Sequence, residues 1–195
     1  MIDKKINECQ VLLIGHFEVG KTSIITKYCG ILPSNLMSSI GFAFYLKHVP
    51  INSIKCRIRI FDYANSSSEK VEGWNRSPQA FGILCIFDIT KRKTFEWIQN
   101  RLTNMLAKKI DEEEGPIYYL VGNKSDLNEK RQVNLEEITN FCKQLKIKYF
   151  ECSAINGNEI NTMFIYLFRE ILEKKKLFEE KKKIKITYKA KCLIF

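Results

Sequence analysis

The chain has 195 residues, 45% of them hydrophobic, which suits one compact domain with a substantial core and leaves no room for a second. Its net charge of +10 is uneven, because residues 174–195 hold nine lysines against two glutamates and so contribute +7. The rest of the chain is therefore only mildly basic, which argues against a nucleic-acid-binding protein, while the cationic end favours an anionic surface as its partner.

The seven cysteines stand singly, without a C-x-x-C pair, and their odd number argues against a closed disulfide framework. This usage fits a reducing, cytosolic environment. No segment approaches the roughly 18 consecutive apolar residues of a membrane span, and Met1–Lys5 lead directly toward a predicted strand. We therefore expect neither a transmembrane nor a secreted protein.

Apolar runs alternate with stretches of helical period along most of the chain. The strand and helix pairs in order are Cys9–Ile14 with Thr22–Cys29, Phe81–Phe87 with Phe95–Ile110, and Ile117–Val121 with Leu135–Leu145. This order predicts a mostly parallel sheet covered by helices on both faces. Phe42–Val49 and Ile54–Phe61 are separated by a short turn and predict a hairpin, so one edge strand should be antiparallel.

A last strand, Ile147–Phe150, precedes a helix from about Gly157 to Lys176, whose apolar positions recur at spacings of three and four. Beyond Lys174 the lysine-rich composition is typical of a flexible, solvated segment. The sequence thus predicts a three-layer α/β domain with a six-stranded sheet over residues 1–175, followed by a flexible tail over residues 176–195.

Residues 15–22 read Gly-His-Phe-Glu-Val-Gly-Lys-Thr, after the apolar run Val11–Ile14 and at the start of a predicted helix. The pattern G-x-x-x-x-G-K-[ST] would arise by chance in such a chain with a probability of about half a percent. In this loop, backbone N–H groups converge on a polyphosphate, Lys21 adds a positive charge, and Thr22 offers its hydroxyl to Mg²⁺. A simple glycine-containing turn is the alternative, and the apolar run before it argues against that. The expected phosphate-binding residues are Gly15, Glu18, Val19, Gly20, Lys21, Thr22 and Ser23.

The tetrapeptide Asn-Lys-Ser-Asp at residues 123–126 follows the predicted strand Ile117–Gly122, at the edge where open parallel sheets bind ligands. The Asp126 carboxylate can accept two hydrogen bonds from adjacent N–H donors, which guanine presents and adenine does not. Asn123 and Lys124 would hold the base edge and cover the ring. Alone, this motif would more often be a polar loop, but about 100 residues after a phosphate loop it indicates guanine binding.

With these residues the chain resembles the Ras-like small GTPases, and the Rab family above all, over about residues 8–175. Further motifs that carry the resemblance are Ser38–Phe44, Ile60–Ala64, Phe87–Thr90 and Glu151–Ala154. The resemblance implies GTP or GDP and Mg²⁺ as ligands. It places Thr22 and Ser39 on the metal, Asp62 on the metal through water, and Ser153 and Ala154 against guanine.

The resemblance also implies a molecular switch in vesicle traffic, expected to be a monomer. An exchange factor, a GTPase-activating protein and effectors would contact residues 31–49 and 61–80. The protein would reside on the cytoplasmic face of an intracellular or plasma membrane, with a cytosolic pool.

Departures from the family pattern cluster on GTP hydrolysis. Ser66 stands where the family has the glutamine that positions the attacking water, and it is too short for that task. Asn65 replaces a glycine, and Phe17 replaces a small residue beside the γ-phosphate. We assign no catalytic residue and expect very slow intrinsic hydrolysis. The alternatives are a partner that supplies the missing groups, a pseudo-GTPase that does not cycle, and a Ras- or Rho-like signalling GTPase.

Residues 192–195, Cys-Leu-Ile-Phe, fit the prenylation box C-a-a-X, and a terminal phenylalanine favours a geranylgeranyl chain on Cys192. One lipid chain anchors weakly, so nearby cations are expected to add affinity for anionic lipid. The cations are Lys181, Lys182, Lys183, Lys185, Lys189 and Lys191. A lysine run that only keeps this end solvated is the alternative.

Overall fold

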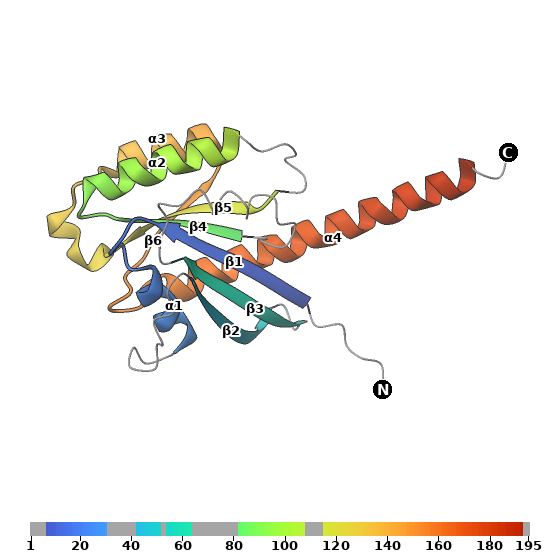
Figure 1. Ribbon diagram of the computed structural model, residues 1–195, viewed down its shortest axis with the longest axis horizontal. Helices are drawn as coiled ribbons and strands as arrows, with labels where there is room; N and C mark the ends of the chain where they lie inside the picture. Colours follow the sequence, from blue (N-terminus) through green and yellow to red (C-terminus); the bar gives the residue numbers. More distant parts are fainter. Residues whose placement is uncertain (1–6, 31–41, 52–53, 64–81, 108–114, 193–195) are drawn as a thin grey trace.

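The computed structural model describes residues 7–30, 42–51, 54–63, 82–107 and 115–192 and shows a six-stranded sheet with helices on both faces (Figure 1). The elements in chain order are β1 Asn7–Gly15, α1 Lys21–Cys29, β2 Phe42–Ile51, β3 Ile54–Tyr63, β4 Gly82–Asp88, α2 Arg92–Ala107, β5 Ile117–Asn123, the short 3₁₀ helix η3 Ser125–Lys130, α3 Leu135–Leu145, β6 Lys148–Glu151 and α4 Ile160–Cys192.

The strand order is β2-β3-β1-β4-β5-β6. Only the pairing of β2 with β3 is antiparallel among these strands, and the other four pairings are parallel. The prediction of a mostly parallel sheet with one antiparallel edge strand is therefore confirmed. Because the strands other than β2 run in the same direction, their carboxyl ends meet at one edge of the sheet, where ligands bind in open α/β folds.

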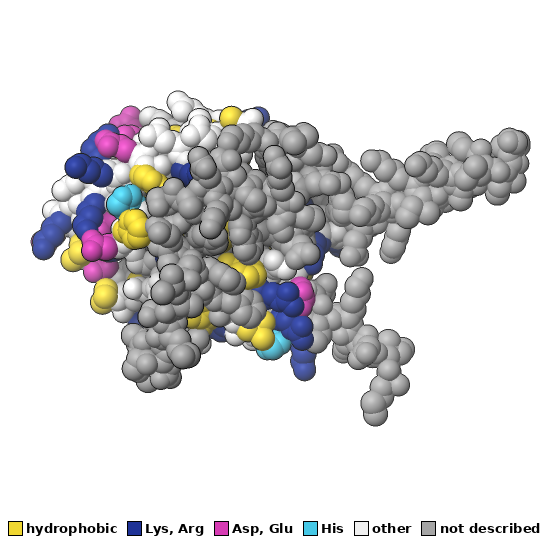
Figure 2. Space-filling model, viewed as in Figure 1, with side chains coloured by type: hydrophobic (Ala, Val, Ile, Leu, Met, Phe, Trp, Pro, Cys, Tyr) yellow, Lys and Arg dark blue, Asp and Glu magenta, His cyan; other side chains and the backbone are white. Residues whose placement is uncertain are grey.

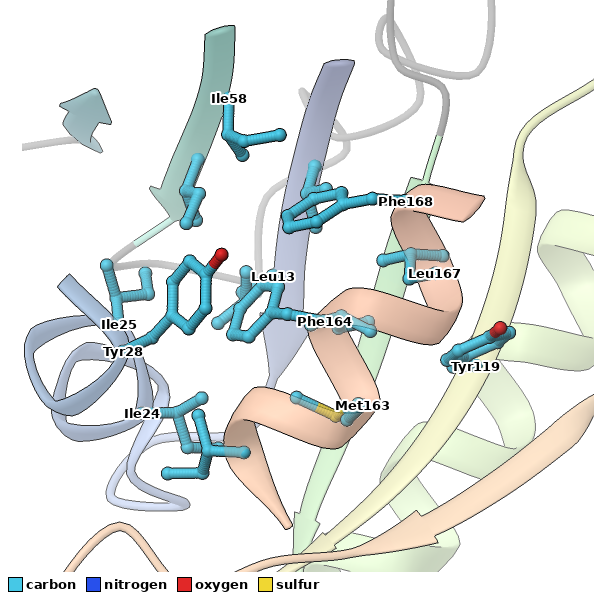
Figure 3. Packing of buried hydrophobic residues seen from close by; sticks show 14 of the residues in the cluster. Leu13, Ile24, Ile25, Tyr28, Ile58, Tyr119, Met163, Phe164, Leu167 and Phe168 are labelled. Carbon is cyan, nitrogen blue, oxygen red and sulfur yellow. The ribbon is translucent and has the colours of Figure 1, made fainter. Parts of the chain in front are cut away.

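Helices α1 and α4 cover one face of the sheet, and α2 and α3 cover the other (Figure 1). On the first face the Tyr28 ring stacks on Phe164 with ring centroids 4.0 Å apart, and Phe168 packs beside them (Figure 3). On the second face the ring centroids of Phe87 and Phe95 lie 4.9 Å apart, between the sheet and α2. Burial on both faces explains why β4 reads as a continuous apolar run instead of an alternating one.

The start of α3 shows how local sequence fixes an element that the sequence predicts well. The Asn134 side chain accepts a hydrogen bond of 2.8 Å from the backbone N–H of Glu136, so it caps the helix. Glu136 and Glu137 then place negative charge in the first turn, where the helix dipole favours it.

Helix α4 continues past Lys176 to Cys192, farther than the periodicity predicts. The apolar stripe that packs on the sheet ends near Leu172, which is why the prediction stops there. The chain after Gly157 contains neither glycine nor proline, and Lys, Glu and Leu are good helix formers, so no residue type ends the helix. Within the described residues, no helix is both long enough and apolar enough to cross a membrane.

Candidate functional site

The loop between β1 and α1 is built around two glycines that allow close backbone approach. Gly20 has φ +90°, and a Cβ there would lie 2.4 Å from Asn123 Nδ2. A Cβ on Gly15 would lie 2.3 Å from the Ile86 carbonyl oxygen on β4. Both positions therefore require glycine, and the loop is pressed against the ends of two neighbouring strands.

Lys21 begins α1 and is only 7% exposed, with its ammonium enclosed by the loop itself. Its Nζ donates hydrogen bonds to the carbonyl oxygens of Gly15 at 2.9 Å and His16 at 3.0 Å. Burial lowers the pKa of Lys21, and the nearby Asp62 carboxylate opposes that effect. A positive charge at the N-terminus of a helix, inside a loop of backbone amides, is suited to binding a polyphosphate.

Thr22 and Asp62 meet where α1 begins and β3 ends. The Thr22 hydroxyl donates a hydrogen bond to Asp62 Oδ2. Asp62 is 4% exposed, and its other oxygen, Oδ1, is buried and has no hydrogen-bond partner among the described residues. A hydroxyl and an unsatisfied carboxylate oxygen are ligands that Mg²⁺ or its bound water accepts, so this pair fits the expected metal. The described residues contain no cluster of three or more His, Cys, Asp or Glu side chains suited to a metal.

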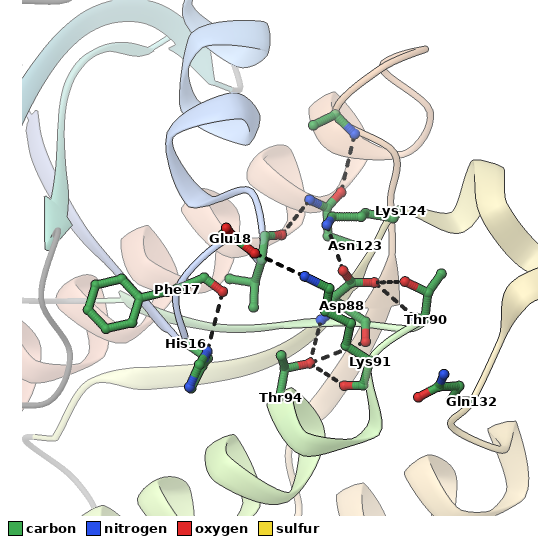
Figure 4. A network of polar contacts seen from close by, with 12 residues as sticks. His16, Phe17, Glu18, Asp88, Thr90, Lys91, Thr94, Asn123, Lys124 and Gln132 are labelled. Carbon is green, nitrogen blue, oxygen red and sulfur yellow. Dashed lines mark hydrogen bonds and ion pairs between the residues drawn. The ribbon is translucent and has the colours of Figure 1, made fainter.

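Asn123, at the end of β5, links three segments of the site. Its buried side chain donates a hydrogen bond of 2.8 Å to the Val19 carbonyl and accepts one of 3.2 Å from the Ala154 backbone N–H (Figure 4). The phosphate loop, the Asn-Lys-Ser-Asp motif and the loop after β6 are therefore fixed relative to one another. Asn123 therefore has a structural role in holding the site together. The sequence alone predicts only that it contacts the guanine base.

Asp126 lies exposed in η3, where Ser153 holds it. The buried Ser153 hydroxyl donates to Asp126 Oδ1 and accepts a hydrogen bond of 3.2 Å from the Ile155 backbone N–H. The family resemblance places Ser153 against guanine, and the structure adds a second role, because the Ser153 side chain orients the Asp126 carboxylate that is predicted to read the base. An acceptor fixed in this way is preorganised for the paired N–H donors of guanine.

Lys124 has φ +67° and its Nζ lies 2.6 Å from Asp88 Oδ2. Asp88 is fully buried at the end of β4, and its Oδ1 accepts hydrogen bonds from the backbone N–H and hydroxyl of Thr90. Burial alone would raise the pKa of Asp88, but the hydrogen bonds from Lys124 and Thr90 outweigh it and hold the pKa below its ordinary value. Lys124 is thus tied to the sheet by a charged carboxylate.

The middle of the phosphate loop shows features that the sequence motifs do not reveal. Glu18 has φ +59°, and its carboxylate lies 3.0 Å from Lys91 Nζ (Figure 4). Phe17 is 50% exposed, and its ring lies edge-on to His16, directed away from the Glu18–Lys91 pair (Figure 4). The sequence does offer one signal for this contact, the acidic residue Glu18 in a loop that is expected to bind an anion.

The structure brings together the predicted phosphate-binding residues, Asp62 and the predicted guanine-binding residues at one edge of the sheet. Ser23 lies exposed in the first turn of α1. Ser39, Asn65 and Ser66 lie outside the described residues, so the metal role of Ser39 and the hydrolysis argument remain predictions. Cys192 is the last residue of α4, and its side chain lies outside the described part of the structure.

The Ras family model matches residues 10–173, which span the phosphate loop, the Asn-Lys-Ser-Asp motif and most of the sheet. The chain belongs to the Ras family. Curated relatives include Rab-13 of Rattus norvegicus, 32% identical over 85% of this chain and 80% of that protein. Rab-8 of Diplobatis ommata is 32% identical over 85% and 78%, and RABC2b of Arabidopsis thaliana is 30% identical over 88% and 83%. The similarity of this Ras-family chain to Rab proteins is therefore confirmed.

Proposed function

We propose that this Ras-family chain is a Rab-like switch in vesicle traffic that binds GTP and GDP with Mg²⁺ and hydrolyses GTP very slowly. The observation that carries the proposal is the pair of hydrogen bonds made by Asn123, because they join the phosphate loop to the loop after β6, where Ser153 holds the Asp126 carboxylate. Family membership supports guanine nucleotides as the ligand class.

Each end of the nucleotide has residues suited to it. Lys21 and the loop amides would bind the phosphates, and Asp126, oriented by Ser153, would accept the two N–H donors of guanine. Thr22 and Ser39 would hold Mg²⁺ directly, and Asp62 would hold it through water. When bound, Mg²⁺ offsets the negative charge of the phosphates.

Slow hydrolysis is expected because two positions that serve GTP hydrolysis in the family carry other residues in this chain. Ser66 is too short to orient a water, and the half-exposed Phe17 ring is large enough to hinder the approach of a partner's arginine. The second candidate is a nucleotide-loaded binding module that does not cycle, which the acidic and aromatic residues of this phosphate loop favour. A Ras- or Rho-like signalling GTPase is the remaining alternative.

The nucleotide assignment is tested by competition of GTP, GDP and ATP for the full-length protein. We expect strong preference for the guanine nucleotides, and we expect Asp126→Asn to lose it because the carboxylate acceptor is gone. Glu129→Gln is the matched control, since it removes a charge from the same short helix without touching Ser153. Equal affinity of the unmutated protein for ATP and GTP would refute the base-reading role of Asp126.

Hydrolysis is tested by single-turnover phosphate release. We expect a rate below the ordinary intrinsic rate of the family, which is on the order of 10⁻⁴ s⁻¹. Ser66→Gln alone should restore little, and Phe17→Gly combined with Ser66→Gln should restore more. An unmutated rate equal to that of an ordinary Rab would show that another group positions the water.

Membrane attachment is proposed from the sequence of residues 192–195, with a geranylgeranyl chain on Cys192 and the preceding lysines against anionic lipid. Exchange factors, activating proteins and effectors are proposed to contact residues 31–49 and 61–80, as in Rab proteins. Intact mass measurement of the protein purified from eukaryotic cells tests the lipid: a mass that shows no added lipid on Cys192 would exclude it.

A further inference from the structure

An acidic side chain lies in the middle of the loop that binds the phosphates. Glu18 directly precedes Val19, whose carbonyl is fixed by Asn123, and follows Phe17 in the same turn. Its φ of +59° is the left-handed conformation that costs about 1 kcal/mol or more for a residue other than glycine. A carboxylate at this point brings negative charge close to a ligand that is itself highly negative.

Lys91 holds this carboxylate from a rigid part of the fold. Its Nζ lies 3.0 Å from Glu18 Oε2. The Lys91 backbone is fixed in the turn between β4 and α2, where its N–H donates to the Asp88 carbonyl and its own carbonyl accepts from the Thr94 N–H. The Glu18 side chain is therefore directed toward Lys91, at the start of α2 (Figure 4).

The ion pair contributes little to folding, because Lys91 is 50% exposed and Glu18 is 79% exposed, and such surface pairs are screened by water. Its surroundings do not supply a strong cationic field either. Figure 2 shows basic and acidic side chains mixed on the end of the molecule where β1 leads into α1. The hollow beside the loop, of about 570 Å³, is lined by Lys91, Arg92 and Lys93 but also by Glu18 and Glu96. The effect of the pair should therefore appear in ligand binding.

We propose that Lys91 is a positioning residue for nucleotide binding, which neutralises the Glu18 carboxylate and keeps it from the phosphates. Without Lys91, the carboxylate is free to repel the ligand. The repulsion is greater for GTP than for GDP, because GTP carries one more phosphate group. This inference rests on the proposed guanine-nucleotide function and adds a determinant of affinity that lies outside the phosphate-binding and base-reading residues.

The experiment is a double-mutant cycle on the full-length protein, with dissociation constants for fluorescent GTP and GDP measured in the presence of Mg²⁺ at low salt. The variants are Lys91→Gln, Glu18→Gln and the two combined. Lys93→Gln is the matched control, because it removes a neighbouring exposed cation that lines the same hollow and forms no ion pair among the described residues. Thermal unfolding of every variant is recorded alongside.

We expect Lys91→Gln to weaken GTP binding about threefold or more, and GDP binding less, with the unfolding temperature nearly unchanged. The phosphate contact expected of Glu18 is through its backbone N–H, which Glu18→Gln retains, so this variant should bind GTP at least as tightly as the unmutated protein. In that background Lys91→Gln should have no further effect. Lys93→Gln should leave both affinities near the unmutated values.

Three results would overturn the inference while leaving the proposed function intact. An equal loss from Lys91→Gln in both backgrounds would show that Lys91 attracts phosphate directly. Weaker nucleotide binding by Glu18→Gln would show that the ion pair maintains the shape of the loop. A loss of affinity for Lys93→Gln equal to that for Lys91→Gln would show a general effect of positive charge. An unmutated protein that binds neither nucleotide would instead overturn the proposed function, and this inference with it.

Discussion

Gly20 and Asn123 lie so close together that a methyl group on Gly20 would push the phosphate loop away from the Asn-Lys-Ser-Asp motif. The backbone of Gly20 needs a positive φ, and the space beside it is filled by the Asn123 amide. Because that amide also holds the Val19 carbonyl, a displacement at Gly20 would reach both ends of the nucleotide site. Residue-scale substitutions here should therefore affect affinity and stability together.

Gly20→Ala should destabilise the fold by about 1–3 kcal/mol and weaken guanine-nucleotide binding at least tenfold, because it adds both backbone strain and a clash. Gly30→Ala is its control: Gly30 has φ +71°, but no described atom lies within 4 Å of the point that an alanine methyl group would occupy. Denaturant unfolding and nucleotide titration measure the two effects. Similar affinity losses for both variants would argue that strain alone, and not contact with Asn123, is responsible.

Thr22→Asn should weaken GTP binding more than GDP binding. The Thr22 hydroxyl contacts Asp62, and Ser39 is expected to join this metal site only when a γ-phosphate is present. Dissociation constants for GTP and GDP, measured with and without Mg²⁺, give the ratio of the two affinities. A variant with an unchanged ratio of GTP to GDP affinity would contradict the assignment of Thr22 to the metal.

The expected binding residues can be assigned from the sequence because each occupies a fixed position in a motif of known chemistry, as Lys21 and Asp126 do. Their supporting contacts were not predictable. The pairs Ser153–Asp126, Asp88–Lys124 and Lys91–Glu18 join residues far apart in the chain, and only the fold brings them within hydrogen-bonding distance. The short spacing inside a motif carries no information about such pairs.

Individual elements differ in how well their ends are defined by sequence. The predicted bounds of α3 match the structure, where Asn134 caps the start of the helix and Lys146, directly after Leu145, has a left-handed backbone with φ +53°. The 3₁₀ helix η3 is absent from the predicted elements, because it is short and begins within the polar Asn-Lys-Ser-Asp motif. Helix α4 ends at Cys192 and not near Lys176 as predicted. An apolar stripe shows where a helix packs against the sheet, but the helix can continue beyond the last packed residue.

Asn134→Ala should lower the free energy of unfolding by about 1 kcal/mol, because it leaves the Glu136 N–H at the start of α3 without its side-chain acceptor. Asn140→Ala, on the exposed side of the same helix, is the control and should be neutral or slightly stabilising, since alanine is the better helix former. Urea unfolding with equal slopes for the two variants gives the comparison. Equal stability of both would mean that the cap is replaced by water at no cost.

The whole molecule combines a folded Ras-family body with a cationic end. Its parallel strands and its three layers follow from the alternation of strands and helices in the sequence, whereas the strand order β2-β3-β1-β4-β5-β6 comes from the structure. Most of the fold could be predicted in this way, because parallel strands need crossover helices and both faces must then be covered. The position of charge on the whole chain was equally visible, since residues 174–195 carry most of the net charge.

Membrane residence should need both the lipid and the lysines. Cys192→Ser should make the protein wholly soluble, because electrostatic attraction alone is screened within about 8 Å at physiological salt. Replacing the six lysines between residues 181 and 191 with glutamine should leave the lipid in place but move the protein toward solution. Cell fractionation measures both, and a Cys192→Ser protein that stays on membranes would place the anchor elsewhere.

The continuous course of α4 changes what an attachment at Cys192 would mean mechanically. At 1.5 Å per residue, the stretch from Lys176 to Cys192 is a stalk of about 24 Å that projects from the body (Figure 1). A flexible tail would let the body rotate freely about its attachment point. A continuous helix instead fixes the distance between the body and the membrane, and it makes the orientation of the body depend on the angle at which the helix meets the lipid. A partner docking on the nucleotide edge would then meet it at a restricted set of heights and angles above the lipid.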